Sequence, residues 1–378
     1  MRLDALETPC LLLDPARVSR NVHRLRNRVE AMGVALRPHL KTAKSIDAAR
    51  LALRGPDSPA TVSTLAEASY FASHGLKDLL YAVGVSPAKL PQVVAIRRET
   101  GANLSIILDN QEQAEAVAAI ARETGERLPV LLEIDVDGHR SGVQLDELDR
   151  LPALAKILTD GGAIPAGVMS HSGASYGLTD DDAIAAAAEE ERVGAVRAAQ
   201  ALRDNGFAAP IVSVGATPTA HAARDLTGVT EVRAGVFMFF DLVQAGVGVC
   251  STDDIAVSVL ATVIGRQERK GWIIVDAGWM AMSRDRGTAG QAVDQGYGVV
   301  CDLEGRPYPD LIMLQANQEH GVLGLRPGSD ASLPALPVGA RVRVLPNHAC
   351  ATAAQHAAYH VLGQGGETTD SWQRMRGW

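Results

Sequence analysis

Lys41 is the residue in this sequence best placed to form a covalent bond with a carbonyl compound. It lies in the run Arg37-Pro38-His39-Leu40-Lys41-Thr42-Ala43-Lys44, between the apolar run 34–36 and a helical pattern over 45–53. A lysine held among apolar groups and other cations becomes a nucleophile that forms imines. A solvated basic turn between strand and helix is the alternative interpretation of this segment.

A second group of reactive residues, His348 and Cys350, follows the apolar run 342–345. If the segment is extended, residues two apart point to the same face, and imidazole and thiolate both suit a divalent ion such as zinc. Two ligands are fewer than a structural zinc site needs, so a buried cysteine beside a hydrogen-bonded histidine is the alternative. His356 and His360, predicted on a following helix, are less favoured as further ligands.

Two other segments carry polar groups between predicted elements. Ser213-Val214-Gly215-Ala216-Thr217-Pro218-Thr219 is a turn of small residues between a strand and a helix, and Gly235 ends the next strand. Such turns present backbone N–H groups and hydroxyls to a phosphate, although a plain turn with a capping threonine has the same composition. In Asn317-Gln318-Glu319-His320-Gly321, His320 is a candidate to donate a proton to a leaving group.

The elements that position these residues alternate between strand and helix over the first two-thirds of the chain. The first predicted helix is capped by Asp14-Pro15 and carries an apolar stripe. Eight apolar runs predict strands that alternate with helical patterns: 34–36, 60–63, 79–83, 104–108, 130–134, 166–169, 211–214 and 232–235. This pattern predicts a (β/α)8 TIM-type barrel, with a doubly wound open sheet as the alternative. In a barrel the catalytic groups follow the C-terminal ends of strands, where Lys41, Arg140, His171, Gly215 and Gly235 lie.

From residue 251 the pattern changes to long β-rich runs with few helical patterns. We therefore predict two domains: residues 9–245 form the barrel, and residues 246–378 form a second, mainly β domain to which residues 1–8 add a strand. The pair His348 and Cys350 then belongs to the β domain.

Composition excludes several classes of function. The chain has 378 residues, 47% of them hydrophobic, and a formal net charge of −8. This charge argues against nucleic acid or an anionic membrane as a partner. The sequence shows no membrane-spanning stretch and no signal peptide, and its four cysteines are scattered, so a reducing cytoplasm is expected.

The Lys41 run, the Asp137–Gly142 and His171–Tyr176 segments and the His348/Cys350 pair together resemble the D-serine dehydratase and D-threonine aldolase group of pyridoxal-phosphate enzymes, which share the alanine-racemase fold. The resemblance extends from Thr8 to Trp378 and implies that Lys41 binds pyridoxal phosphate covalently and acts as the base. It also implies a divalent metal ion on His348 and Cys350. The implied cofactor-binding residues are Lys41, Arg140, His171, Tyr176, Gly215, Thr217, Gly235 and Val236.

The resemblance favours dehydration of a small D-3-hydroxy amino acid by a homodimer. The related aldolases carry an aspartate where this chain has Cys350, so the dehydratase is preferred and the aldolase remains open. A racemase would use a tyrosine such as Tyr297 or Tyr308, and a pyridoxal-phosphate carrier would need no β domain. If the substrate has a second carboxylate, Arg284 and Arg286 are the candidate cations.

Overall fold

The computed structural model describes residues 2–363 and 365–378, which divide into two units. One unit contains residues 22–237 and 377–378, and the other contains residues up to 21 and 238–376. Helix α1 (Pro15–Ala31) begins in the second of these and continues into the first. As predicted, it starts at Asp14, whose carboxylate accepts a hydrogen bond from the Arg17 amide at 3.0 Å, and its apolar stripe is buried.

The unit of residues 22–237 is a parallel barrel, which confirms the predicted fold. Its strands follow the hydrogen-bonded order β2-β10-β9-β8-β6-β5-β4-β3. They are β2 (Ala35–Pro38), β3 (Pro59–Val62), β4 (Asp78–Gly84), β5 (Asn103–Leu108), β6 (Pro129–Asp135), β8 (Ile164–Ser170), β9 (Ile211–Val214) and β10 (Glu231–Ala234), with a two-residue β7 (Val143–Gln144) beside β6. A parallel bridge between His39 and Thr61 joins the two ends of this order. The closure of the barrel therefore lies two residues before Lys41.

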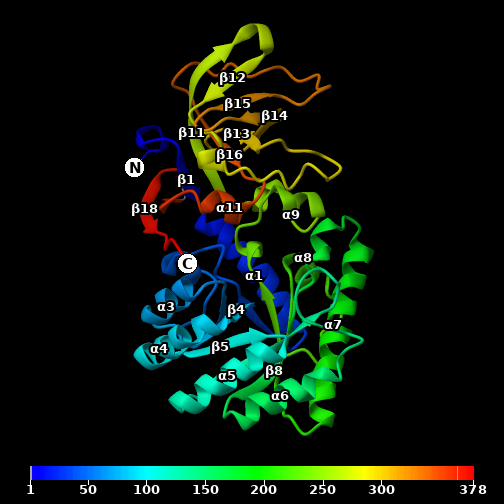
Figure 1. Ribbon diagram of the computed structural model, residues 1–378. Coiled ribbons are helices and arrows are strands. Elements are labelled where there is room, and N and C mark those ends of the chain that lie inside the picture. The colour runs from blue at the N-terminus through cyan, green and yellow to red at the C-terminus, as the bar shows by residue number, and fades with distance from the viewer. Residues whose placement is uncertain (1, 364) are drawn as a thin grey trace. The chain divides into compact units, whose positions relative to one another are not determined.

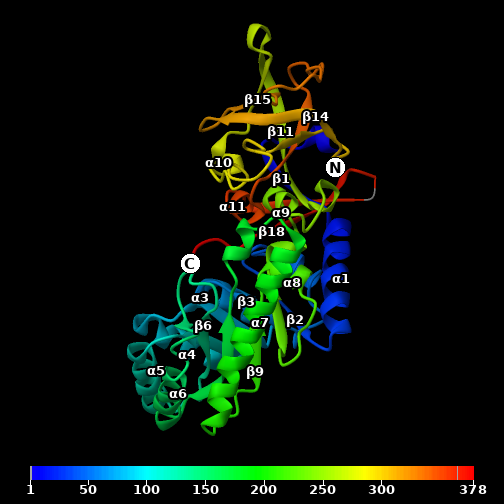
Figure 2. The same ribbon diagram turned by 90° about the vertical axis from the view of Figure 1, so that its right-hand side faces the viewer.

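Helices lie outside these strands, as Figures 1 and 2 show. They are α2 (Ile46–Arg50), α3 (Leu65–Ser73), α4 (Leu90–Thr100), α5 (Gln111–Thr124), α6 (Arg150–Asp160), α7 (Asp181–Asp204) and α8 (Thr217–Ala222). Side-chain caps fix several starts: Asn110 accepts from Gln113 N at 3.0 Å at α5, and Asp180 accepts from Ala183 N at 2.9 Å at α7. Helix α5 stops at Gly125, which has φ +72°, a backbone conformation that favours glycine.

The other unit is built on an antiparallel sheet ordered β12-β15-β14-β13-β16-β11-β1-β17-β18. Because β11 also pairs with β12, the first six strands close into a small barrel, and β1, β17 and β18 extend from β11. The strands, all but β17 labelled in Figure 1, are β1 (Cys10–Leu13), β11 (Val257–Gln267), β12 (Trp272–Val275), β13 (Val299–Cys301), β14 (Pro307–Ala316), β15 (Gly321–Leu325), β16 (Arg341–Leu345), β17 (Ala358–Leu362) and β18 (Thr368–Gln373). Short α-helices accompany them: α9 (Leu242–Val247), α10 (Trp279–Met282) and α11 (Ala349–Ala353).

The amino-terminal segment differs from the sequence prediction. Residues 2–8 form no strand; Leu3–Ala5 is a turn of 3-10 helix. The strand is β1, whose Cys10 pairs with Leu260 of β11, so this stretch joins the mainly β unit although we had assigned it to the barrel. All four β1 residues are buried, and an apolar run of four does not reveal which of two sheets will bury it.

No helix within residues 2–363 and 365–378 has both the length and the apolar character needed to cross a bilayer.

Candidate active site

The backbone before Lys41 is held from two sides. His39 N donates to Ala234 O of β10 at 2.7 Å, and Leu40 N donates to Thr61 O of β3 at 2.8 Å. Lys41 follows directly in a turn, where its side chain is exposed. This exposure agrees with the solvated turn, the alternative interpretation of the segment, although the residues on both sides of Lys41 are buried.

Lys44 is not a second reactive amine. Its Nζ lies 3.2 Å from Oε1 of Glu67, a carboxylate whose side chain is fully buried. Lys44 also has a positive φ of 44°, which is uncommon for a residue with a side chain. The turn therefore separates the roles of its two lysines: Lys44 pairs with a carboxylate, and Lys41 extends from the end of the strand.

His171 follows β8 and contacts the turn after β9. Its Nδ1 lies 2.9 Å from the carbonyl oxygen of Gly215. Burial lowers the pKa of His171 to about 4 despite this hydrogen bond, so the ring is neutral at pH 7. A neutral ring that donates from Nδ1 leaves Nε2 as an acceptor. The Tyr176 ring lies 6.4 Å away, measured between ring centroids.

The Gly215–Thr219 turn has two features that fit a phosphate group. Gly215 has φ +136°, and a Cβ added there would clash with the Arg233 carbonyl oxygen; only glycine lets the backbones approach this closely. Thr217, the first residue of α8, has a buried hydroxyl that finds no hydrogen-bond partner among the described residues. An unpaired buried hydroxyl is costly unless a ligand satisfies it. The turn thus fits the phosphate of pyridoxal phosphate.

Gly235 lies where β10 meets the Lys41 turn. A Cβ added at Gly235 would lie 3.2 Å from Cβ of His39 and 3.3 Å from Oγ1 of Thr42. Both distances are tighter than ordinary van der Waals contact. The structure thus brings Gly235 and the adjoining Val236 next to the lysine turn.

Arg140 lies in the exposed loop after β6, near enough to His171 for its charge to contribute to the lowered pKa of that ring. Its nearest acid is Glu133 of β6, with Nη2 and Oε1 4.0 Å apart. Burial raises the pKa of Glu133, against the opposing effect of Arg140 and of a 3.1 Å hydrogen bond from Ser141. The predicted contact of Arg140 with the cofactor stays a prediction.

Glu191 is a buried carboxylate that supports the candidate cofactor turns and that the sequence did not reveal. This carboxylate of α7 is fully buried and accepts hydrogen bonds from the ends of two strands. Its donors are Gly215 N (2.9 Å), Thr219 Oγ1 (3.0 Å), Ser170 Oγ (3.2 Å) and Ser172 N (3.2 Å). Glu191 therefore fixes the turns that carry both His171 and Thr217. Its position in the buried stripe Ile184, Ala188, Ala195 and Ala198 was the available signal, because a charge on an apolar helix face requires partners.

In the other unit, His348 and Cys350 lie together, but not for the reason predicted. His348 is the N-cap residue of α11, with φ −133°, and Cys350 lies in the first turn of that helix. The segment is therefore not an extended strand with side chains alternating between faces. A hydrogen bond links the Cys350 and His348 side chains, so the two donors remain adjacent.

A carboxylate holds the His348 ring. Nδ1 of His348 lies 2.7 Å from Oδ2 of Asp285. Burial disfavours a charged ring, but Asp285, Cys350 and Asp241 outweigh it and raise the pKa of His348 to about 11. The same hydrogen bond holds the pKa of Asp285 below its usual value. The surroundings of this ring favour positive charge, as a cation site requires.

His348 and Cys350 could provide part of the ligand set of a metal ion. Within residues 2–363 and 365–378, no group of three or more His, Cys, Asp or Glu side chains is arranged to hold an ion. His348 and Cys350 would therefore supply two ligands of a type that suits zinc, with further positions left to water and substrate. Such an open site is typical of catalytic metals.

Neither of the two further histidines is placed as a ligand. His356 Nε2 lies 2.9 Å from the carbonyl oxygen of Ala281, and burial lowers the pKa of this ring. His360 lies in strand β17 opposite Leu12, not on a helix. The predicted helix carrying both residues is wrong, because α11 ends at Ala353 and β17 begins at Ala358.

His320 lies in the turn that joins β14 to β15. Its carbonyl oxygen accepts a 2.8 Å hydrogen bond from Asn317 N, and its side chain is exposed. The same turn offers the carbonyl oxygens of Asn317 and Gln318 to the amides of Trp279 and Met280, at 2.8 and 3.1 Å. The role of His320 as proton donor stays a prediction.

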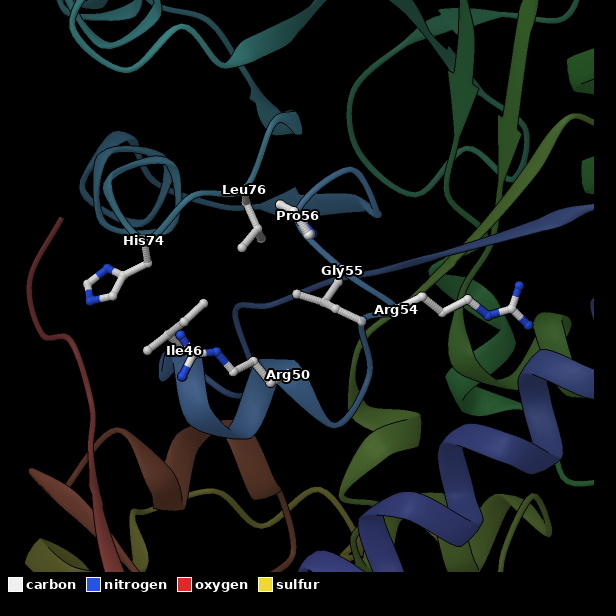
Figure 3. Close-up of a pocket in the computed structure, with 8 residues that line it drawn as sticks. Ile46, Arg50, Arg54, Gly55, Pro56, His74 and Leu76 are labelled. Atoms are coloured by element: carbon white, nitrogen blue, oxygen red, sulfur yellow. The ribbon is translucent and has the colours of Figure 1, made fainter.

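A pocket of about 410 Å3 on the barrel unit contains none of these candidates. Figure 3 shows it beside α2, lined by Ile46, Arg50, Leu53, Arg54, Gly55, Pro56, His74 and Leu76. Its basic groups already have partners: Arg50 pairs with Asp47 and Arg54 with Glu30. His74 Nδ1 lies 2.7 Å from the Tyr70 carbonyl oxygen. We assign this pocket no role in the chemistry.

Comparison with known families agrees with this division of the chain. Residues 13–243 match the model of the alanine racemase N-terminal domain, and residues 256–362 match that of a putative serine dehydratase domain. The chain is 52% identical to D-threo-3-hydroxyaspartate dehydratase of Delftia sp. (strain HT23), covering 99% of this chain and 98% of that protein. A solved structure of the dehydratase from Delftia sp. HT23 superposes with a TM-score of 0.96 at 51% identity over the full length of both chains.

More distant relatives include two other activities. D-serine dehydratase of Dictyostelium discoideum is 29% identical over 100% of this chain and 98% of its own length. D-threonine aldolase of Arthrobacter sp. is 28% identical over 98% of this chain and 93% of its own length.

Proposed function

We propose that this chain, which belongs to the family that joins an alanine racemase N-terminal domain to a serine dehydratase domain, is a lyase that dehydrates D-3-hydroxy amino acids. The substrate we favour is D-threo-3-hydroxyaspartate, and the products are oxaloacetate and ammonia. The observation that carries this proposal is 52% identity along nearly the whole of both chains to a dehydratase of that substrate. The cofactors we propose are pyridoxal phosphate and a divalent metal ion.

Pyridoxal phosphate, when bound, supplies an electron sink for the charge left at Cα, and the metal ion supplies a Lewis acid. The phosphate would be held by the Gly215–Thr217 turn, where the buried Thr217 hydroxyl has no hydrogen-bond partner among the described residues. His171 would meet the cofactor with a neutral ring. Glu191 would keep both turns in place from the buried side of α7, without touching the cofactor.

Lys41 is the base in this proposal. Its amine takes the Cα proton, and the C–H electron pair then forms a Cα–Cβ double bond as the Cβ–O bond breaks. The β-oxygen leaves with the electron pair of that bond and departs as water once protonated; His320 is our candidate donor. The released enamine takes up water and yields oxaloacetate and ammonia, so the water lost in elimination is regained in hydrolysis.

His348 and Cys350 would bind the ion that takes the β-hydroxyl. Two protein ligands leave positions for the hydroxyl oxygen and for water. A thiolate and a neutral imidazole fit a borderline-soft ion better than a hard one, so zinc is favoured over manganese. A homodimer is the expected assembly, to be measured by light scattering on the purified enzyme.

A substrate with a second carboxylate needs a second cation, and Arg284 is the better candidate. Arg286 is committed to Asp294, with Nη2 2.7 Å from the carboxylate. Arg284 is exposed, and its guanidinium carbon lies 4.7 Å from the centroid of the Trp279 ring. Arg284 also directly precedes Asp285, which contacts His348. A stacked guanidinium keeps its edge available for a bidentate carboxylate.

Product analysis tests the proposal. The purified enzyme, with pyridoxal phosphate and Zn2+, should convert D-threo-3-hydroxyaspartate to equal amounts of oxaloacetate and ammonia. Glycine and glyoxylate in their place would make the protein an aldolase. Faster formation of pyruvate from D-serine would leave the dehydratase class intact but replace the substrate.

A further inference from the structure

A carboxylate from a separate loop contacts the His348 ring. Asp285 lies between α10 and β13 in the sequence, and its Oδ2 is 2.7 Å from Nδ1 of His348. Its other oxygen, Oδ1, accepts a hydrogen bond from Gly287 N at 2.8 Å. Both carboxylate oxygens are therefore in use, one within the loop and one on the histidine.

The backbones on both sides of this contact are also fixed. Asn347, immediately before His348, donates from Nδ2 to Asp285 O at 3.2 Å and to Gly296 O at 2.7 Å. Its Oδ1 accepts from Thr288 Oγ1 at 3.0 Å. Ala349, immediately after His348, donates its amide to Oδ2 of the buried Asp241 at 2.9 Å. The carboxylate and the ring that it holds are thus parts of one hydrogen-bonded frame.

An imidazole binds a metal only through a nitrogen that carries no proton. A carboxylate acceptor at Nδ1 keeps a proton there, so Nε2 is the nitrogen that gives up its proton to bind a metal. We propose that Asp285 is a positioning residue for the metal: it fixes the His348 tautomer and directs Nε2 to the ion that Cys350 shares. This inference rests on the proposed metal site at His348 and Cys350.

The same geometry makes Asp285→Asn a sharp perturbation. If the Asn oxygen keeps the hydrogen bond from Gly287 N, its amide NH2 faces Nδ1 of His348. An NH2 group can only donate, so Nδ1 must become the acceptor and the ring proton moves to Nε2, where it blocks the metal. The substitution therefore retains side-chain size and the loop contact while reversing the polarity of the contact with His348.

Asp294 provides a matched control in the same part of the chain. Its Oδ1 accepts from Gly296 N at 2.9 Å, as Asp285 Oδ1 accepts from Gly287 N, but its Oδ2 meets Arg286 in place of a histidine. Asp294→Asn should thus reproduce the local effect of the amide on a turn without affecting His348.

The test is equilibrium dialysis of the cofactor-loaded protein against chelator-buffered Zn2+, with bound zinc measured by elemental analysis. We expect D285N to raise the zinc dissociation constant about 10- to 100-fold, the usual effect of losing an outer partner of a metal-bound histidine. D294N should stay within about two-fold of wild type. Equal zinc affinity in D285N and wild type would overturn the role of Asp285. Failure of wild type itself to bind zinc would instead reject the metal site.

A double variant separates positioning from general damage to the loop. In an H348A background Asp285 has no ring to orient, so adding D285N should change zinc affinity by less than about two-fold, as expected of two residues that act through one contact. A further loss of ten-fold or more in that background would contradict the proposal, because Asp285 would then act on the metal by another route.

Discussion

Replacing Thr217 by valine should stabilise the cofactor-free protein and weaken its binding of pyridoxal phosphate. The buried Thr217 hydroxyl finds no partner among the described residues, and an unsatisfied buried hydroxyl costs about 1–3 kcal/mol. Valine retains the branched shape and removes the hydroxyl. We therefore expect T217V to raise the free energy of unfolding of the cofactor-free protein by about 1 kcal/mol.

The opposite sign is expected for cofactor binding. A hydrogen bond to a charged group contributes about 1.5–3 kcal/mol, which corresponds to a roughly 10- to 150-fold weaker binding of pyridoxal phosphate. The assays are urea denaturation of the cofactor-free protein and titration of that protein with pyridoxal phosphate, followed by absorbance.

Thr219 is the natural control, two residues away in the same turn. Its hydroxyl donates to Glu191 Oε2 at 3.0 Å and accepts from Ala216 N at 3.1 Å. T219V should therefore destabilise the cofactor-free protein by about 2 kcal/mol. If T217V destabilised the protein as T219V does and left cofactor affinity unchanged, the assignment of this turn to the phosphate would be refuted.

Two further predictions concern substrate selection and pH. Arg284→Gln should raise KM for 3-hydroxyaspartate about 10-fold and leave D-serine turnover unchanged. As a control, Arg286→Gln should change neither quantity by more than about three-fold. Equal losses on both substrates for Arg284→Gln in steady-state kinetics would argue against a carboxylate contact. The folded state holds the pKa of His171 near 4 by burial, so below pH 6.5 the unfolded state binds the extra proton and stability falls as pH falls to 4. Between these pH values wild type should lose up to about 3 kcal/mol more than His171→Gln, and parallel urea midpoints for the two proteins would contradict this.

The barrel was predictable because each of its strands is a short apolar run in a chain that alternates strand and helix. The runs near residues 79–83 and 130–134 form β4 and β6, and each of these strands can be recognised from its own local sequence pattern. The mainly β unit is harder, since Cys10 pairs with Leu260 and nothing in either segment specifies a partner 250 positions away.

In the candidate site, too, local features were predictable from the sequence and distant contacts were not. Lys41, His348 and Cys350 were singled out by their chemical types, but it was the resemblance of their segments to a known family that favoured the reactive interpretation, and their roles stay predictions. Their supports were not found, because Asp285 and Glu191 act through contacts with residues 63 and 24 positions away in the sequence. No sequence pattern around a single loop carboxylate shows whether it contacts a metal-binding residue or is solvated.

In the proposed reaction Lys41 removes the Cα proton, and a metal ion on His348 and Cys350 would assist departure of the β-hydroxyl. Proton NMR of D-threo-3-hydroxyaspartate in D2O measures both steps at once, as loss of the α-proton signal and as formation of oxaloacetate. We predict that chelation of the metal stops oxaloacetate formation while exchange of the α-proton continues, and that Zn2+ restores elimination. Elimination that continues at an unchanged rate without metal, or an α-proton that stops exchanging when the metal is removed, would contradict this division.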